Sequence, residues 1–171
     1  MLQLQKKAQQ LIKHIAIILA FLLMLSSPVA AQDYDKGLAA YINEDYATAF
    51  KEWKPLAEQG LAIAQLNLGI MYSNGQGVVQ DYKEAVKWYK LAAKQGLSPA
   101  QFNLSLMYRK GWGVPKDYVE AYKWANLSSA NGHSKGAELR ELIAVNMTPA
   151  QVEKAQNYSR ECIKINYKGC C

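Results

Sequence analysis

Lysines that recur at a constant spacing are the first candidates for a functional surface in this sequence. Lys51, Lys87 and Lys123 lie 36 residues apart, and Lys54 and Lys90 repeat the same spacing. If the spacing reflects stacked structural units, their ammonium groups form a column that would attract an acidic segment of a partner. The alternative is an ordinary solvated helix face, because lysine is common there and a glutamate accompanies each position of the column. The solvated face is the commoner arrangement, and the basic groove is the functional hypothesis.

The same segments carry further residues that could take part in binding. Lys83 falls on one helical face together with Lys87 and Lys90. Trp88 and Trp124 are also 36 residues apart, and aromatic side chains often anchor partners at interfaces. Packing between repeats is the simpler role for two tryptophans at this spacing, and ring edges lining a groove are the functional alternative.

Residues for catalysis, metal binding or cofactor binding lack the partners that such chemistry needs. Beyond residue 31 the only histidine is His133, and no base, nucleophile or ligand accompanies it at a useful spacing. The sequence contains neither an H-E-x-x-H motif nor a pair of C-x-x-C motifs, so we expect no metal site and no cofactor. Two G-x-G stretches, 75–77 and 111–113, follow a helical pattern rather than a strand. We therefore interpret them as turns and not as phosphate loops.

All three cysteines lie in the last ten positions of the chain. Cys162 can pair with Cys170 or with Cys171, which would fasten the end of the chain to the preceding helix. Either pairing leaves one thiol over, free or intermolecular. A strained vicinal bond between Cys170 and Cys171 is the third possibility.

An internal repeat explains the constant spacing. Residues 64–96 and 100–132 align without gaps, and 17 of the 33 pairs are identical, so the two segments must share one structure. Each unit contains two helical patterns, such as those of 81–95 and 97–109. A single helical hairpin cannot bury its apolar face, so stacked units supply the core. We predict an all-α fold, an α-solenoid of stacked antiparallel helix pairs.

Glycines, alanines and tyrosines at repeated positions are assigned structural roles. The glycines end helices or form the turns between units, small alanines let helices approach closely, and the tyrosines belong to the helical stripes. These residues are Gly60, Gly75, Gly77, Gly96, Gly111, Gly113, Gly132, Ala64, Ala85, Ala100, Ala121, Tyr72 and Tyr108.

The repeated pattern A-x-x-N-L-x-x-M-Y-x-x-G-x-G-V-x-x-D-Y-x-x-A-x-x-W resembles the Sel-1-like repeat, a relative of the tetratricopeptide repeat. The resemblance covers roughly residues 35–145, and it implies a right-handed superhelix used for protein–protein interaction. Some secreted members of the family bind or slowly hydrolyse β-lactams, so a weak hydrolase is the alternative function. The serine chemistry of serine β-lactamases requires S-x-x-K, and the nearest match here is Thr48-Ala49-Phe50-Lys51. We therefore expect a binding scaffold and no enzyme.

Residues 1–31 have the features of a secretory signal peptide. Three lysines precede an apolar run at 15–25, and small residues at 26–31 predict cleavage after Ala31. The run is too short to cross about 30 Å of hydrocarbon, so no membrane span is expected after cleavage. Cleavage would lower the net charge from +6 to +3, which argues against a nucleic-acid partner. We predict a periplasmic or secreted protein whose partner is another protein or peptide, with an acidic segment if the basic groove exists.

The remaining segments complete the predicted organisation. Residues 32–60 form a partial repeat closer to a tetratricopeptide, 61–96 and 97–132 are the two full repeats, and 133–147 is a degenerate repeat end. Residues 148–171 form a capping helix and a tail with cysteines. Thr148, Pro149 and Gln151 have the spacing of a capping box, so we expect this last helix to begin at Thr148.

Overall fold

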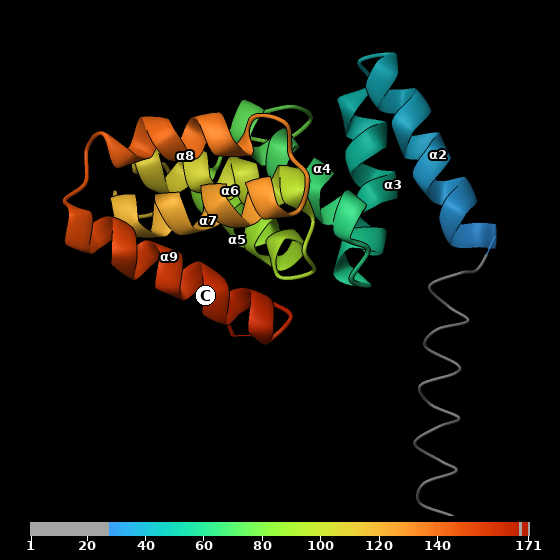
Figure 1. Ribbon diagram of the computed structural model, residues 1–171. Coiled ribbons are helices and arrows are strands. Elements are labelled where there is room, and N and C mark those ends of the chain that lie inside the picture. Colours follow the sequence, from blue (N-terminus) through green and yellow to red (C-terminus); the bar gives the residue numbers. More distant parts are fainter. Residues whose placement is uncertain (1–27, 168, 171) are drawn as a thin grey trace, which may run out of the picture.

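The computed structural model describes residues 28–167, 169 and 170, and all regular structure within them is helical. The helices stack in sequence order, each packing on the one before it up to α8 (Figure 1). They are α2 (Pro28–Ile42), α3 (Tyr46–Glu58), α4 (Ala62–Asn74), α5 (Tyr82–Ala93), α6 (Ser98–Lys110), α7 (Tyr118–Ala130), α8 (Gly136–Ala144) and α9 (Pro149–Lys164). The predicted α-solenoid of helix pairs is confirmed.

The repeated Asp-Tyr pairs mark the start of three equivalent helices. Asp45, Asp81 and Asp117 are the N-caps of α3, α5 and α7, and each carboxylate accepts backbone N–H bonds from the first turn. These bonds satisfy donors that a helix N-terminus otherwise leaves without partners. The 36-residue period of the sequence is therefore a period of helix starts.

The G-x-G turns have two separate structural tasks. The first glycine of each turn, Gly75 or Gly111, ends a helix in the left-handed conformation. The second glycine lies against the backbone of the preceding repeat, because a Cβ on Gly113 would stand 2.2 Å from the carbonyl oxygen of Tyr82. No side chain fits there, so the turn fixes the distance between successive units.

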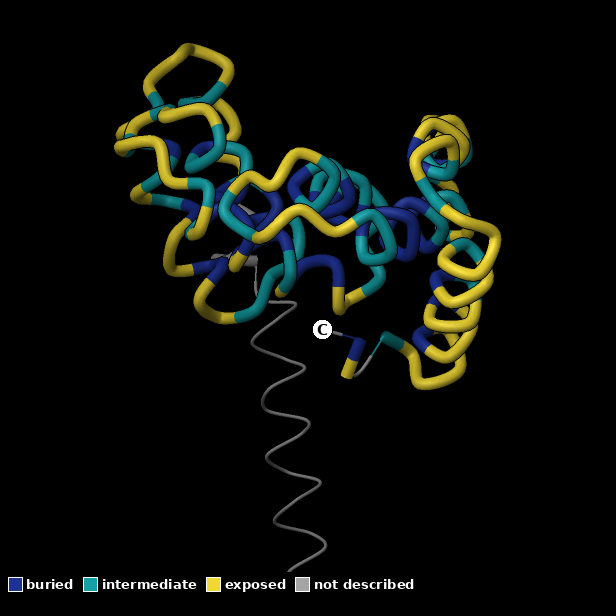
Figure 2. The backbone as a smooth tube through the Cα atoms, turned by 90° about the vertical axis from the view of Figure 1, so that its left-hand side faces the viewer, coloured by how far each residue is buried: buried dark blue, intermediate teal, exposed yellow. Residues whose placement is uncertain are grey.

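The core runs along the whole stack as three adjoining clusters of buried side chains. The four repeated alanines, at 64, 85, 100 and 121, are fully buried, as their role in close helix packing requires. Figure 2 shows buried stretches facing the inside of the stack and exposed stretches on its outer turns and on one side of the outer helices.

The last helix begins as the sequence predicts and packs on α7. The Thr148 side chain accepts from the Gln151 backbone, and the Gln151 side chain accepts from the Thr148 backbone. α9 lies along α7, while Leu142 on α8 and Val145, which follows α8, remain exposed. The cap thus covers the face of α7 rather than the outer side of α8.

The predicted signal peptide falls largely outside the described residues. Residues 1–27 are not described, and Ala31, the predicted cleavage point, lies near the start of α2. Among the helices from α2 onward, none combines the length and apolar character needed to cross a membrane.

Candidate protein-binding surface

Two equivalent helices carry the same group of three side chains. We call them the first triad (Glu84, Lys87 and Trp88, on α5) and the second triad (Glu120, Lys123 and Trp124, on α7). In each triad the glutamate stands three residues before the lysine and four before the tryptophan, so its side chain can reach both. The lysine Nζ lies 3.1 Å from a carboxylate oxygen in the first triad and 2.7 Å in the second. It also stands over the tryptophan ring, 5.5 Å and 4.8 Å from the ring centroid.

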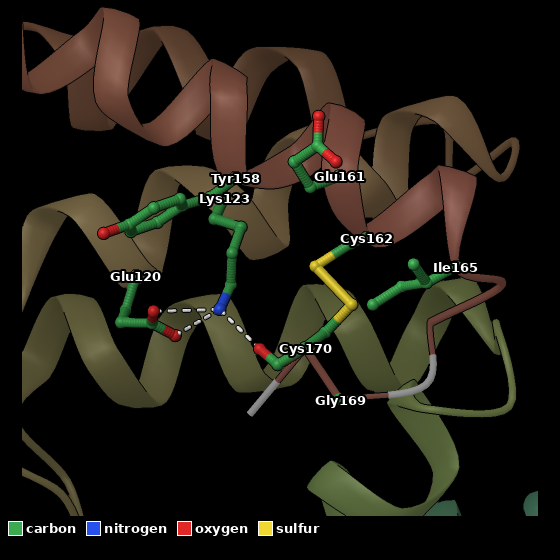
Figure 3. Close-up of a pocket in the computed structure, with 8 residues that line it drawn as sticks. All are labelled: Glu120, Lys123, Tyr158, Glu161, Cys162, Ile165, Gly169 and Cys170. Atoms are coloured by element: carbon green, nitrogen blue, oxygen red, sulfur yellow. Dashed lines mark hydrogen bonds and ion pairs between the residues drawn. A yellow bond between two sulfur atoms is a disulfide. The ribbon is translucent and has the colours of Figure 1, made fainter.

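The two triads differ in what covers them. The Lys87 side chain is 59% exposed, whereas that of Lys123 is 4% exposed. Lys123 Nζ donates to Glu120 and, at 2.8 Å, to the backbone carbonyl of Cys170, as Figure 3 shows. The prediction that Lys123 belongs to an exposed basic column is therefore wrong. The chain end, 47 residues away in sequence, lies on top of it.

The described part of the C-terminal tail, residues 165–167, 169 and 170, is held at three points. A disulfide joins Cys162 on α9 to Cys170, which is one of the pairings that the sequence left open. The Tyr167 hydroxyl donates to Asn131 Oδ1 at 2.7 Å, and the Cys170 carbonyl accepts from Lys123. Between α7, α9 and the tail remains a pocket of about 250 Å³, seen in Figure 3. Lys123 and Glu120, which line it, are already paired with each other.

The remaining lysines of the predicted groove are distributed over α3 and α5. Lys51, Lys54 and Lys83 are exposed, with Lys54 Nζ 5.9 Å from the Phe50 ring centroid. Lys90 is half-buried and lies over the Tyr108 ring. Among the lysines of the predicted groove, the exposed positive charge therefore lies on α3 and α5 and does not extend to α7.

The two tryptophans belong to the core. Trp124 is fully buried and Trp88 is 7% exposed, so neither presents a ring face to a partner. Trp124 Nε1 donates to Glu120 at 3.2 Å. Trp88 Nε1 is buried and has no hydrogen-bond partner among the described residues.

The structure contains a second cleft that the sequence pattern did not predict. It has a volume of about 120 Å³ and lies between α2, α3 and α4. Tyr34 and Tyr41 flank the Trp53 ring, with centroid distances of 5.9 and 5.4 Å, and Asn67 Nδ2 donates to the Tyr34 hydroxyl. The heptad spacing of the two tyrosines is the signal in the sequence that could have indicated it.

The residues considered for catalysis make contacts that stabilise the fold. His133 stacks on Phe102 with ring centroids 4.3 Å apart, and burial, assisted by Lys135, lowers its pKa. Thr48, the nearest match to a catalytic serine, belongs to the first turn of α3, where its backbone N–H donates to Asp45. Within residues 28–167, 169 and 170, no three His, Cys, Asp or Glu side chains come together as metal ligands.

Comparison with known proteins agrees with this architecture. The Sel1 repeat family model matches residues 62–97 and 98–133. A protective antigen of uropathogenic Escherichia coli with an SLR fold aligns over 82% of this chain with a TM-score of 0.77 and 31% identity. A Sel1 repeat protein from Oxalobacter formigenes aligns over 76% with a TM-score of 0.64 and 32% identity.

The chain spans only part of these two structures, because the alignments cover 31% and 55% of their lengths. No curated protein sequence matches it. The repeat period, the helix pairs and the two matched units lead to one assignment: the chain carries two Sel1 repeats within an all-α solenoid.

Proposed function

We propose that this protein is an exported scaffold that binds another protein or peptide on the face formed by α3 and α5. Sel1 repeats generally mediate protein binding, and proteins of this fold are typically scaffolds without enzymatic activity. We choose this face because the two triads differ. Lys123 is buried and bonded to the chain's own tail, whereas the Lys87 side chain is exposed to solvent. An acidic segment suits the exposed lysines of these two helices.

Export is part of the proposal and rests on two features. The N-terminal sequence has the composition of a signal peptide, and a disulfide such as Cys162–Cys170 is a feature of proteins in oxidising compartments. The bacterial cell envelope, either the periplasm or the outer surface, would provide such an environment. A regulatory role for the complex in the envelope is consistent with a scaffold that has no chemistry of its own.

A capture experiment tests the function. The chain from residue 32 onward, immobilised in its oxidised form, is incubated with envelope extract at about 150 mM salt, where surface charges still interact over ~8 Å. We expect at least one protein to be retained by the natural sequence and lost with the double variant Lys51→Glu/Lys87→Glu. Lys123 is left unchanged, because a buried substitution there would disturb the fold. If the natural sequence and the double variant retain the same protein equally well, binding on this face is contradicted.

The alternative function, weak β-lactam hydrolysis, is tested on the same preparation. We expect no turnover of a chromogenic cephalosporin above the buffer rate. Turnover that disappears on replacing one residue of the α3–α5 face would overturn the scaffold-only proposal.

A further inference from the structure

The C-terminal tail lies in a groove whose residues recur one repeat earlier. In the occupied groove the tail contacts the end of α5, the second triad and the end of α7. The residues that define it are Gly96, Lys123, Trp124, Leu127 and Asn131. Subtracting 36 gives the residues that we call the open groove, which are Gly60, Lys87, Trp88, Leu91 and Gln95.

The tail shows what chemistry the occupied groove accepts. The Tyr167 ring lies over Gly96, so that a Cβ there would stand 3.1 Å from Tyr167 Cε2, and its hydroxyl donates to Asn131. Three residues later, the Cys170 carbonyl accepts from Lys123. An aromatic side chain and, three positions on, an oxygen acceptor are therefore the two features that seat the segment.

The open groove has the equivalent residues, and no segment equivalent to the tail covers them among the described residues. Gln95 Nε2 donates to the Gly60 carbonyl and to Gln65 Oε1, much as Asn131 Nδ2 donates to Gln101 Oε1 in the occupied groove. No atom stands within 4 Å of a Cβ built on Gly60. Leu91 is 40% exposed, whereas Leu127, its equivalent in the occupied groove, is fully buried in one cluster with Cys162 and Cys170. Together with the exposed Lys87 side chain, these positions form an uncovered apolar and cationic strip.

One buried donor in the open groove lacks its partner. Trp124 Nε1 donates to Glu120 in the occupied groove, whereas Trp88 Nε1 is buried without a partner among the described residues. A buried donor without an acceptor is unfavourable, because it has lost its bonds to water. In the open groove both Glu84 oxygens are directed to Lys87, at 3.3 and 3.1 Å. In the occupied groove both Glu120 oxygens also lie close to Lys123 Nζ, at 2.8 and 2.7 Å, and Glu120 still accepts from Trp124. The indole bond is therefore made in the covered groove and not in the open one.

The charge around the two grooves differs, and this selects the ligand. α7 carries one lysine and one glutamate, the Lys123–Glu120 pair, and it binds a neutral carbonyl. α5 carries Lys83, Lys87 and Lys90 against Glu84 alone. The excess of positive charge favours a carboxylate where the occupied groove holds a carbonyl.

We propose that the open groove binds a turn-forming segment of a partner protein, shaped like the tail with its left-handed Asn166 and Tyr167, that presents an aromatic residue and, three residues later, an aspartate or glutamate. The ring lies on Gly60 with its polar edge at Gln95, the intervening backbone covers Leu91, and the carboxylate binds Lys87. This inference rests on the proposed protein-binding function and specifies the partner's motif.

A short peptide derived from the tail provides the probe. It has the sequence of residues 165–170 with alanine in place of Lys168 and aspartate in place of Cys170, and it carries a fluorophore at its N-terminus. Binding to the full chain, with its disulfide intact, is followed by fluorescence anisotropy at about 50 and 150 mM salt, because charge pairing weakens as salt rises. Peptides with the tyrosine replaced by alanine, or the aspartate by asparagine, test the two anchoring features.

The variants separate the groove from general charge. We expect Lys87→Glu and Leu91→Asp each to weaken peptide binding at least tenfold, with an unchanged circular dichroism spectrum. Lys116→Glu, an exposed lysine on the turn before α7, is the matched charge control and should change binding less than twofold. Peptide binding should also alter the tryptophan fluorescence of the natural chain, and this change should disappear in Trp88→Phe.

The contrary outcomes are equally definite. Equal losses in Lys87→Glu and Lys116→Glu, or full binding by Leu91→Asp, would overturn the proposal. So would concentration-dependent dimerisation that Leu91→Asp abolishes, because the groove would then hold the tail of a second copy. If the capture experiment retains a partner that still binds Leu91→Asp, the scaffold function stands and only this motif fails.

Discussion

Replacing the buried lysine should destabilise the fold far more than replacing its exposed counterpart. Methionine at position 123 keeps the aliphatic stem packed on Trp124 and removes only the ammonium group, so no large cavity forms. The change deletes a charge-assisted bond to Glu120 and leaves the Cys170 carbonyl without its donor. A hydrogen bond to a charged group contributes about 1.5–3 kcal/mol. Because Glu120 is 25% exposed and can regain water, we expect a loss of about 2 kcal/mol in the free energy of unfolding.

The matched variant is Lys87→Met. It removes an ion pair of the same type from an exposed site, where such pairs contribute roughly 0–1 kcal/mol. Urea unfolding of the oxidised chains, followed by the helical circular dichroism signal, gives both free energies, and a loss of about 2 kcal/mol should lower the Tm by about 6 °C. If Lys123→Met and Lys87→Met cost the same, the tail does not bury Lys123 in solution and the contrast between the triads has no basis.

Three further perturbations test other parts of the structure. Replacing Cys162 and Cys170 by serine should cost ~2–3 kcal/mol, measured by urea unfolding, and should speed amide exchange in the tail while leaving exchange in α4 unchanged. Gly113→Ala, whose Cβ would meet the backbone of α5, should lower the Tm more than Gly132→Ala, which meets no atom within 4 Å and costs only about 1 kcal/mol of backbone strain. Burial raises the pKa of Tyr89 to about 12, so the folded state holds its proton more tightly than the unfolded state, whose pKa is near ~10. Stability is therefore lost as the pH rises above the unfolded value and through the folded one. By about pH 11 the natural chain should lose about 1.4 kcal/mol more stability than Tyr89→Phe, and equal losses would contradict this assignment.

Much of the candidate site was accessible from the sequence because it is part of the repeat. The 36-residue period located the lysines on equivalent helices, and Lys51 and Lys87 are exposed as a binding face requires. The aromatic cleft between α2, α3 and α4 was not predicted, since α2 lies outside the two strong repeat copies. Its formation depends on how Tyr34 and Tyr41 meet Trp53 across two helices.

The sequence by itself determined the helices, their caps and the turns between them, because these features depend on residues close together in the chain. Asp81 can begin a helix and Gly75 can end one whatever lies elsewhere. Only the tertiary structure decided which face of each helix is covered. The two triads have the same residues at the same spacing, yet one lysine is 59% exposed and the other 4%. Local sequence sets the direction in which a side chain leaves its helix, but burial depends on what packs there. At Lys123 that is α9 together with the tail, whose Cys170 lies 47 residues away.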